Sequence, residues 1–425
     1  MQSHSVRANG LPDRAFLVAT YRDVRDAARA RELLAELQEL TRSCGAVVAG
    51  ELVVHLREPH PRLLVGTGKA DEITARCREL DANVVVFDDA LSPAQQRNWE
   101  EVAGLRALDR HEVILQIFAD RASTREAELQ IQLAQAEYLL PRLHNAWRHL
   151  SRQQGGLGIR GGEGEKQLEI DHRLLRRRIV GLKAELEKVR KQRAEQRKRR
   201  QGVPVPSAAI VGYTNVGKSL LLNELTGARV LVADKLFATL DPTTRRLTLP
   251  HNRTLLLTDT VGFVRKLPHL LVEAFKATLE EAVLADLLLH VADITSPSFA
   301  EHLATTQEVL AEIGAGGKEA LVVFNKIDLA DDFLVRRLRH EYPLAVFVSA
   351  RTGAGFDTLR ARLAEIVNRH LGELCLCLPP DQYAVLAFLH RAGNVLAERF
   401  EDDGIYVTVA VPAKYRRDLE KYVIP

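Results

Sequence analysis

The chain has 425 residues, enough for two to four domains, and 46% of them are hydrophobic, enough to fill several cores. The formal net charge is only +3. No run of about 18 apolar residues occurs and the first residues carry no apolar segment, so we expect no membrane span, no secretory leader and a cytoplasmic protein. Four irregularly spaced cysteines, Cys44, Cys77, Cys375 and Cys377, exclude a disulfide framework or a zinc site. Cys375 and Cys377 lie on one face of a candidate strand, and we expect them to be packed thiols.

Candidate strands alternate with amphipathic stretches in residues 1–122, which we take as one domain. The strand candidates are residues 16–19, 63–65 and 84–87. Strands that alternate with helical patterns are typical of a small parallel α/β domain.

Two short motifs in this domain raise the question of a second ligand. Gly66-Thr-Gly-Lys69 opens a helix after the second candidate strand, but it lacks the spacer and the hydroxyl of a phosphate loop. We therefore favour a turn with an exposed Lys69, and ATP binding is the alternative. Asp88 and Asp89 end the third candidate strand, and we interpret them as helix caps in preference to metal ligands.

Residues 123–200 carry two heptad seams around a glycine-rich segment. Apolar residues recur at steps of three, four or seven: Leu129, Leu133, Ala136, Leu140, Leu143 and Trp147, then Leu168, Leu175, Ile179, Leu182, Leu186 and Val189. Such seams predict an antiparallel helical hairpin with its tip at residues 155–164. Pro141 falls within the first helix so predicted and should kink it.

The second helix of this hairpin is strongly basic. Residues 173–200 contain thirteen lysines and arginines and three acidic residues, a charge of +10, so the rest of the chain sums to −7. A solvated helix face is the ordinary explanation, but the single sign favours contact with a polyanion such as RNA. The candidate RNA contacts are Arg160, Lys166, Arg176, Arg177 and Arg178.

After a stiff linker at residues 202–206, residues 201–371 are predicted to form a doubly wound, mostly parallel sheet. A full phosphate-loop motif lies between its first strand and first helix: Gly212, Tyr213, Thr214, Asn215, Val216, Gly217, Lys218 and Ser219. Gly212 and Gly217 allow close approaches that a side chain would block, and the N–H groups of such a loop wrap phosphates at a helix N-terminus. Lys218 would reach the β- and γ-phosphates, and Ser219 would ligate Mg²⁺.

Two further motifs follow in the order that a GTP site requires. Asp259-Thr260-Val261-Gly262 ends an apolar strand, which places a carboxylate near the metal and a glycine N–H near the γ-phosphate. Asn325-Lys326-Ile327-Asp328 ends another, and Asp328 can accept both N–H donors of guanine, which adenine does not offer. Ser349 and Ala350 follow a third strand, and their backbone would cap guanine O6. The predicted GTP-binding set is completed by Leu220, Phe237, Ala238, Thr239 and Arg351.

These motifs resemble the translation-factor-like GTPases, and the residues around them resemble the HflX family of ribosome-associated GTPases. Residues 236–243, Leu-Phe-Ala-Thr-Leu-Asp-Pro-Thr, are similar to that family's first switch. Further family motifs occupy residues 91–98, 117–122, 133–135, 138–143, 155–161 and 167–169, so the resemblance runs from about Phe16 to Phe400. The chain departs from the family's usual residues at Trp99, Leu220 and residues 162–166.

The resemblance implies a role for several residues and a partner for the hairpin. It implies Thr239 as a Mg²⁺ ligand, Asp259 as a ligand through water, and Lys218, Thr239 and Gly262 as the catalytic set. It further implies that the partner is the large ribosomal subunit with its ribosomal RNA, which the chain binds as a monomer in its GTP state. The tip would reach toward the peptidyl-transferase centre, and the chain would split or rescue stalled ribosomes, with hydrolysis driving release.

Two positions bear on how hydrolysis proceeds. Ras-like enzymes place after Asp-x-x-Gly a glutamine that orients the attacking water, but here that position is Phe263. We therefore expect weak intrinsic activity that a partner, above all the ribosome, stimulates. Asn215 occupies the position at which potassium-activated GTPases hold their ion, so K⁺ is a second candidate cofactor. An asparagine that only braces its own loop is the alternative.

The last residues, 372–425, are predicted to form a small α+β domain with strands at 374–378 and 405–411 and a helix at 382–399. Three functions fit the whole chain. A ribosome-acting GTPase is favoured, and a GTPase that assists ribosome assembly or RNA modification would keep the same site and hairpin. A non-catalytic scaffold with structural GTP is supported by Phe263 and opposed by the intact Thr239 and Asp259.

Overall fold

The computed structural model describes residues 13–143, 162–200, 205–227, 236–237, 239–250, 253–266, 279–369, 371–392, 394–401 and 403–424. The chain separates into two compact units, and we treat each by itself. The first comprises the described parts of 1–189, 233–241 and 266–277, and the second those of 190–232, 242–265 and 278–425. Among the described residues, no helix is both long enough and apolar enough to cross a membrane. The finer division into four domains stays a prediction.

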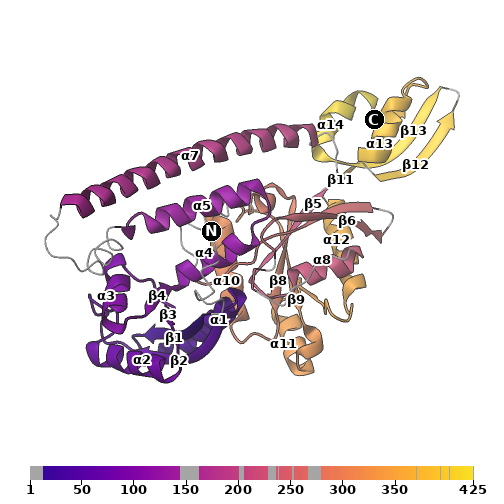
Figure 1. Cartoon of the computed structure of the whole chain (residues 1–425). Helices are drawn as coiled ribbons and strands as arrows, with labels where there is room; N and C mark the ends of the chain where they lie inside the picture. The colour runs from indigo at the N-terminus through magenta and orange to yellow at the C-terminus, as the bar shows by residue number, and fades with distance from the viewer. Residues whose placement is uncertain are drawn as a thin grey trace. The chain divides into compact units, whose positions relative to one another are not determined.

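The first unit is built on a four-stranded parallel sheet in the order β2-β1-β3-β4 (Figure 1). Its strands are β1 (Arg14–Tyr21), β2 (Val47–His55), β3 (Val84–Phe87) and β4 (Arg106–Asp109). The helices between them are α1 (Ala27–Ser43), α2 (Thr67–Glu79) and α3 (Pro93–Ala103), and α4 (Arg110–Arg121) follows the last strand. The α/β fold predicted for the N-terminal part is therefore confirmed.

One predicted strand of this sheet is wrong. Residues 63–65 form a buried turn before α2, and the second strand of the domain is β2 instead. The turn is apolar because it lies in the core: the indole Nε1 of the fully buried Trp99 donates to the Leu63 carbonyl at 2.8 Å. A short run of buried apolar residues has the same sequence pattern in a turn as in a strand. Lys69 lies in the first turn of α2 with a half-exposed side chain that pairs with Glu72 at 2.6 Å.

Two long helices follow the α/β fold; the first of them, and the second up to Val189, belong to the first unit. These are α5 (Arg125–Leu139) and α7 (Gly162–Arg200), the long magenta helix of Figure 1. With 39 residues, α7 is about 58 Å long. The expected kink at Pro141 is wrong, because α5 ends at Leu139 and Pro141 lies in the turn that follows. Proline cannot continue a helix, since it has no N–H to donate and restricts the residue before it.

The seam between α5 and α7 lies where the heptads place it. Leu129 packs with Leu182 and Leu186 in one buried cluster, and Leu133 and Val189 border it. Arg125 pairs with Glu185 and Glu137 with Lys183, both at 2.8 Å, so the two helices run in opposite directions. The predicted tip falls outside the described residues up to position 161, and its last residues, 162–164, belong to α7.

The second unit holds a six-stranded sheet in the order β10-β9-β8-β5-β7-β6. Its strands are β5 (Ser207–Gly212), β6 (Thr243–Leu249), β7 (Arg253–Asp259), β8 (Leu287–Asp293), β9 (Ala320–Asn325) and β10 (Val346–Phe347). All neighbours are parallel except β6, which runs antiparallel to β7. This is the predicted doubly wound, mostly parallel sheet, and every residue of β8 but the last is buried.

Helices of the second unit alternate with these strands. They are α8 (Lys218–Thr226), α10 (Phe299–Glu312), α11 (Asp332–Glu341) and α12 (Phe356–Arg369). Because parallel strands end at the same edge of a sheet, the residues that follow β5, β7 and β9 gather at one edge.

A three-stranded antiparallel sheet, drawn in yellow in Figure 1, ends the chain, in the order β11-β13-β12. Its elements are β11 (Leu371–Leu378), α13 (Tyr383–Ala392), β12 (Asn394–Glu401), β13 (Gly404–Pro412) and α14 (Ala413–Leu419). The predicted helix at 382–399 is wrong in its second half, which is β12. Cys375 is exposed and Cys377 half-buried, so the expectation of packed thiols fails for Cys375.

Candidate active site

The loop between β5 and α8 depends on glycine at both of its ends. Gly212 has a φ of 148°, and a Cβ there would lie 2.2 Å from the Val291 carbonyl oxygen. Gly217, the N-cap of α8, has a φ of 90°, and a Cβ there would lie 2.4 Å from Nδ2 of Asn325. No other residue fits either position without moving the neighbouring strand or the asparagine.

Lys218 is turned back onto this loop. Its Nζ donates to the carbonyl oxygens of Tyr213, at 2.7 Å, and Gly212, at 3.1 Å. The side chain is buried, and burial lowers the pKa of Lys218 to about 8, although the Asp259 carboxylate works in the opposite direction. An ammonium held here without a full counter-charge favours an anionic ligand.

Ser219 and Asp259 meet at the start of α8 and the end of β7. The Ser219 hydroxyl donates to Oδ2 of Asp259 at 2.6 Å. A hydroxyl beside a buried carboxylate is the oxygen donor set that Mg²⁺ takes when phosphate oxygens supply the remaining ligands. Within the described ranges no group of three or more His, Cys, Asp or Glu side chains is placed to hold a metal.

The Asp-Thr-Val-Gly motif is bound to the phosphate-loop motif by backbone pairing. Thr214 N donates to the Phe263 carbonyl at 2.8 Å, and Phe263 N donates to the Gly212 carbonyl at 3.1 Å. A Cβ on Gly262 would lie 2.7 Å from Cγ2 of Thr214 and 2.9 Å from Nζ of Lys218. Phe263 is 2% exposed and is part of the core.

The Asn-Lys-x-Asp motif joins two loops at the same edge of the sheet. Asn325 donates through Nδ2 to the Val216 carbonyl at 2.8 Å and accepts through Oδ1 from Ala350 N at 2.9 Å. Ser349 donates its hydroxyl to Oδ1 of Asp328 at 2.7 Å. The fully buried Asn325 thus ties the phosphate-loop motif to the residues after β10.

The predicted site residues differ in burial and in the part of the structure to which they belong. Tyr213, Thr214, Val216, Lys218, Asp259, Thr260, Val261, Asn325, Ser349 and Ala350 are buried, Asn215 and Arg351 are exposed, and Leu220, Lys326, Ile327 and Asp328 belong to the same loops and helix. Phe237 and Thr239 are described within the first unit, whereas Ala238 and Arg160 lie outside the described residues, as does the side chain of Lys166. Arg176, Arg177 and Arg178 are exposed on α7.

Comparison with known proteins shows which family of GTPases the chain resembles. Three family models match in succession: GTP-binding GTPase N-terminal at residues 31–119, GTP-binding GTPase Middle Region at 121–200, and 50S ribosome-binding GTPase at 207–326. Proteins named GTPase HflX are 44% identical in Akkermansia muciniphila, with 97% of both chains covered, and 46% identical in Escherichia coli K12, with 88% of both covered. A third, from Lacrimispora saccharolytica, is 45% identical, with 95% of both chains covered.

The chain belongs to the HflX family of GTPases. It is therefore a GTP hydrolase, as the sequence predicts. The resemblance drawn from its motifs is confirmed over nearly its whole length.

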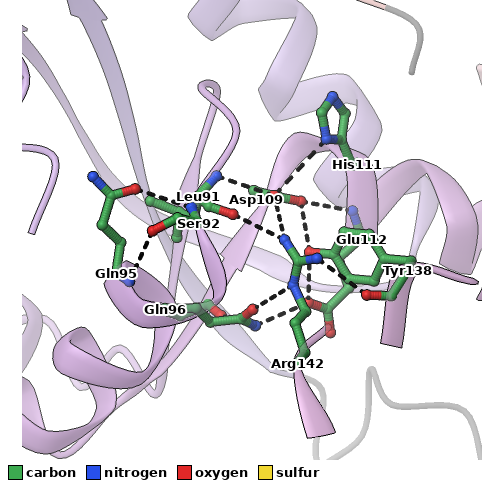
Figure 2. Close-up of polar contacts among 10 residues, drawn as sticks. Leu91, Ser92, Gln95, Gln96, Asp109, His111, Glu112, Tyr138 and Arg142 are labelled. Carbon is green, nitrogen blue, oxygen red and sulfur yellow. Dashed lines mark hydrogen bonds and ion pairs between the residues drawn. The ribbon is translucent and has the colours of Figure 1, made fainter. Parts of the chain in front are cut away.

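Motifs of the HflX family in the first unit converge on a buried polar network (Figure 2). Arg142 donates through Nε to Gln96 at 2.9 Å, and its guanidinium lies 3.6 Å from the centre of the Tyr138 ring. The Tyr138 hydroxyl donates to the fully buried Asp109 at 3.0 Å, and Gln96 donates to Glu112 at 3.1 Å. Burial raises the pKa of both Glu112 and Tyr138. The network holds the turn that follows α5 at Arg142.

A second cluster, unforeseen from the sequence, contains Asp88 and Asp89. Asp88 accepts from the buried Arg110 at 2.7 Å and from Lys266 at 2.6 Å, and Lys266 also reaches Asp89 at 3.0 Å. Burial alone would lower the pKa of Lys266, but the two aspartates outweigh it and raise that pKa. The interpretation of these aspartates as caps is wrong, because Ser92 caps α3 and the aspartates hold Lys266, four residues beyond Gly262.

We expect Gly262→Ala to slow GTP hydrolysis about tenfold or more, because the new methyl group would push residues 262–263 away from Thr214 and Lys218. Gly317→Ala is the matched control, since a Cβ there meets nothing within 4 Å. Single-turnover hydrolysis and thermal unfolding should be measured together. A Gly262→Ala chain with the unchanged rate would contradict the close packing described above.

Proposed function

We propose that this HflX-family GTPase binds the large ribosomal subunit in its GTP state, and that it splits or rescues stalled ribosomes in the cytoplasm, where it acts as a monomer. Hydrolysis would then drive its release. The observation that carries the proposal is α7, a single helix of 39 residues whose Arg176, Arg177 and Arg178 are all exposed. A helix whose charged side chains are mostly positive is suited to bind the phosphate backbone of RNA. The match to a family model described as a 50S ribosome-binding GTPase supports the same partner.

In this proposal the loop of residues 212–219 holds the phosphates of GTP. The loop leads into the start of α8, where the helix dipole favours negative charge. Lys218 would exchange its two carbonyl partners for phosphate oxygens, an exchange that replaces neutral acceptors by charged ones. The Thr214 hydroxyl, which is buried and has no hydrogen-bond partner among the described residues, fits a ligand oxygen as well.

Mg²⁺ fits the donor set of this site, and the residues proposed to hold it are Ser219, Thr239 and, through water, Asp259. When bound, it would neutralise charge on the β- and γ-phosphates. Asn215, exposed and with a φ of 59°, is the residue proposed to hold K⁺. Equal hydrolysis rates in K⁺ and Na⁺ buffers would contradict that second ion.

Guanine would be read by Asp328 and by the backbone after β10. Asp328 is held by Ser349, which leaves its carboxylate oriented to accept from the two N–H groups of guanine. The side chain of Asn325 is hydrogen-bonded to Val216 and Ala350, so its role would be to hold these two loops together. The remaining residues of the predicted set, Tyr213, Val216, Leu220, Phe237, Ala238, Thr260, Val261, Lys326, Ile327 and Arg351, are proposed as neighbours of the nucleotide.

Hydrolysis would depend on a partner because Phe263 offers no group that orients water. The aromatic side chain is in the core, whereas a Ras-like enzyme has a glutamine at this position. The proposal therefore assigns the missing help to the ribosome, reached through the hairpin of α5 and α7.

Co-sedimentation tests the proposed partner. The chain is expected to pellet with mature large subunits in the presence of a GTP analogue and to stay in the supernatant with GDP. Arg176→Glu/Arg177→Glu/Arg178→Glu should weaken pelleting and its salt dependence, and Arg336→Glu/Arg337→Glu/Arg339→Glu on α11 is the control. A preference for assembly precursors would favour the assembly role, and equal pelleting in both nucleotide states would favour a scaffold.

The lowered pKa of Lys218 predicts how nucleotide binding responds to pH. Below about pH 8 the free chain already carries the ammonium, but above it binding must take up a proton, so the Kd for GDP should rise by up to about tenfold per pH unit. The same lowered pKa predicts that the nucleotide-free chain becomes more stable to unfolding as the pH rises from about 8 toward 10.5. In this range Lys218 has lost its proton in the folded chain and takes one up when the chain unfolds.

Calorimetric titration with GDP between about pH 7 and about pH 9 measures this response. In Ser219→Ala the Kd for GDP should change with pH as in the unsubstituted chain, because the hydroxyl does not titrate. In Lys218→Met this pH dependence should be lost. A Kd of the unsubstituted chain that does not change over this range would contradict the predicted proton uptake by Lys218 on nucleotide binding.

A further inference from the structure

Residues 236–241, which contain the proposed Mg²⁺ ligand Thr239, belong to the first unit. Three of them are buried there: Leu236, Phe237 and Leu240, each 3% exposed. The Phe237 ring packs edge-on against Phe118 of α4 with 4.5 Å between ring centres. The chain before Thr239 is thus attached to a helix of the N-terminal α/β fold through Phe237, and Leu240 after it is buried as well.

Asp241 adds a polar attachment to a different helix. Its Oδ2 accepts from the backbone N of Ser123, at 3.1 Å, and from the Ser123 hydroxyl, and its Oδ1 accepts from the Thr124 hydroxyl at 2.6 Å. Thr124 is the N-cap of α5, and its own side-chain oxygen accepts from Ala127 N at 3.3 Å. A carboxylate at this end of a helix is also stabilised by the helix dipole.

The helix capped in this way is the first helix of the hairpin. Leu129 and Leu133 of α5 pack on Leu182, Leu186 and Val189 of α7. The exposed arginines proposed to contact ribosomal RNA lie on α7, two turns or fewer before this seam begins. A shift of the hairpin would therefore pull on Thr124, and through Asp241 on a segment only two residues from Thr239.

We propose that Asp241 is a positioning residue: it links the cap of α5 to the switch segment, so that the hairpin and the nucleotide site sense each other through Thr239. This rests on the proposed function, in which Thr239 holds Mg²⁺ and α7 meets the ribosome. Three hydrogen bonds on one carboxylate give the link a defined geometry, and two of them come from hydroxyl groups that single substitutions remove.

Hydrogen exchange tests the link without ribosomes. In the unsubstituted chain, amides in the first turn of α5, Ala127 and Glu128 among them, should exchange at rates that differ at least about threefold between the GDP and GTP-analogue states. In Asp241→Ala this difference should vanish while GDP affinity changes by less than about threefold. Thr124→Val should also reduce the difference in exchange between the two nucleotide states. Thr124→Ser, which keeps the hydroxyl, should retain that difference. Asp120→Ala removes a nearby carboxylate of α4 and is the control.

Ribosomes supply the second measurement. The acceleration of GTP hydrolysis by large subunits should fall at least about tenfold in Asp241→Ala and stay unchanged in Asp120→Ala. If large subunits fail to accelerate the unsubstituted chain, the proposed function is lost, and the exchange experiment still decides on Asp241. Nucleotide-dependent exchange that persists in both Asp241→Ala and Thr124→Val would overturn the link.

Discussion

The nucleotide site depends on a short backbone pairing between residues 212–214 and residue 263. Two hydrogen bonds, from Thr214 N and from Phe263 N, join the phosphate-loop motif to the Asp-Thr-Val-Gly motif. The pairing requires glycine at 212 and 262, because a Cβ at either position would meet backbone or Lys218 at less than 3 Å. It also turns the Phe263 side chain into the core. One local constraint therefore brings the phosphate-binding groups together and leaves the position after Gly262 without a group that orients water.

Two short segments of the chain pack with one compact unit although they adjoin strands of the other. Residues 236–241 and Lys266 pack with the first unit, although they flank strands of the second. Lys266 is held by a carboxylate pair, and Asp241 by two hydroxyl groups and an amide. These are polar, partly exposed attachments, weaker than the buried core beside them. Attachments of that strength are suited to being made and released during a nucleotide cycle.

Much of the site could be predicted from the sequence because its residues are close in sequence to the strands that place them. Gly212 to Ser219, Asp259 to Gly262 and Asn325 to Asp328 each follow a buried strand of one parallel sheet, so the topology alone brings them to one edge. The contacts of Asp241, Lys266 and Arg142 could not be predicted, because each partner is far away in the chain and sequence spacing carries no sign of it. A signal existed for one of them, since Ser123-Thr124 before an apolar run is typical of a helix start. The error at residues 63–65 arose because a short buried apolar run has the same pattern in a turn as in a strand. The error at residues 394–399 has another origin, because that stretch is half-buried or exposed where the structure describes its side chains and its alternation gave no strand signal.

We infer that this GTPase hydrolyses GTP slowly by itself because Phe263 has no group that orients water, and that the partner of the hairpin supplies what is missing. Single-turnover hydrolysis of GTP, measured with and without purified large ribosomal subunits, tests it most directly. The account predicts an acceleration of about a hundredfold or more on addition of the subunits. Equal rates under the two conditions would contradict it.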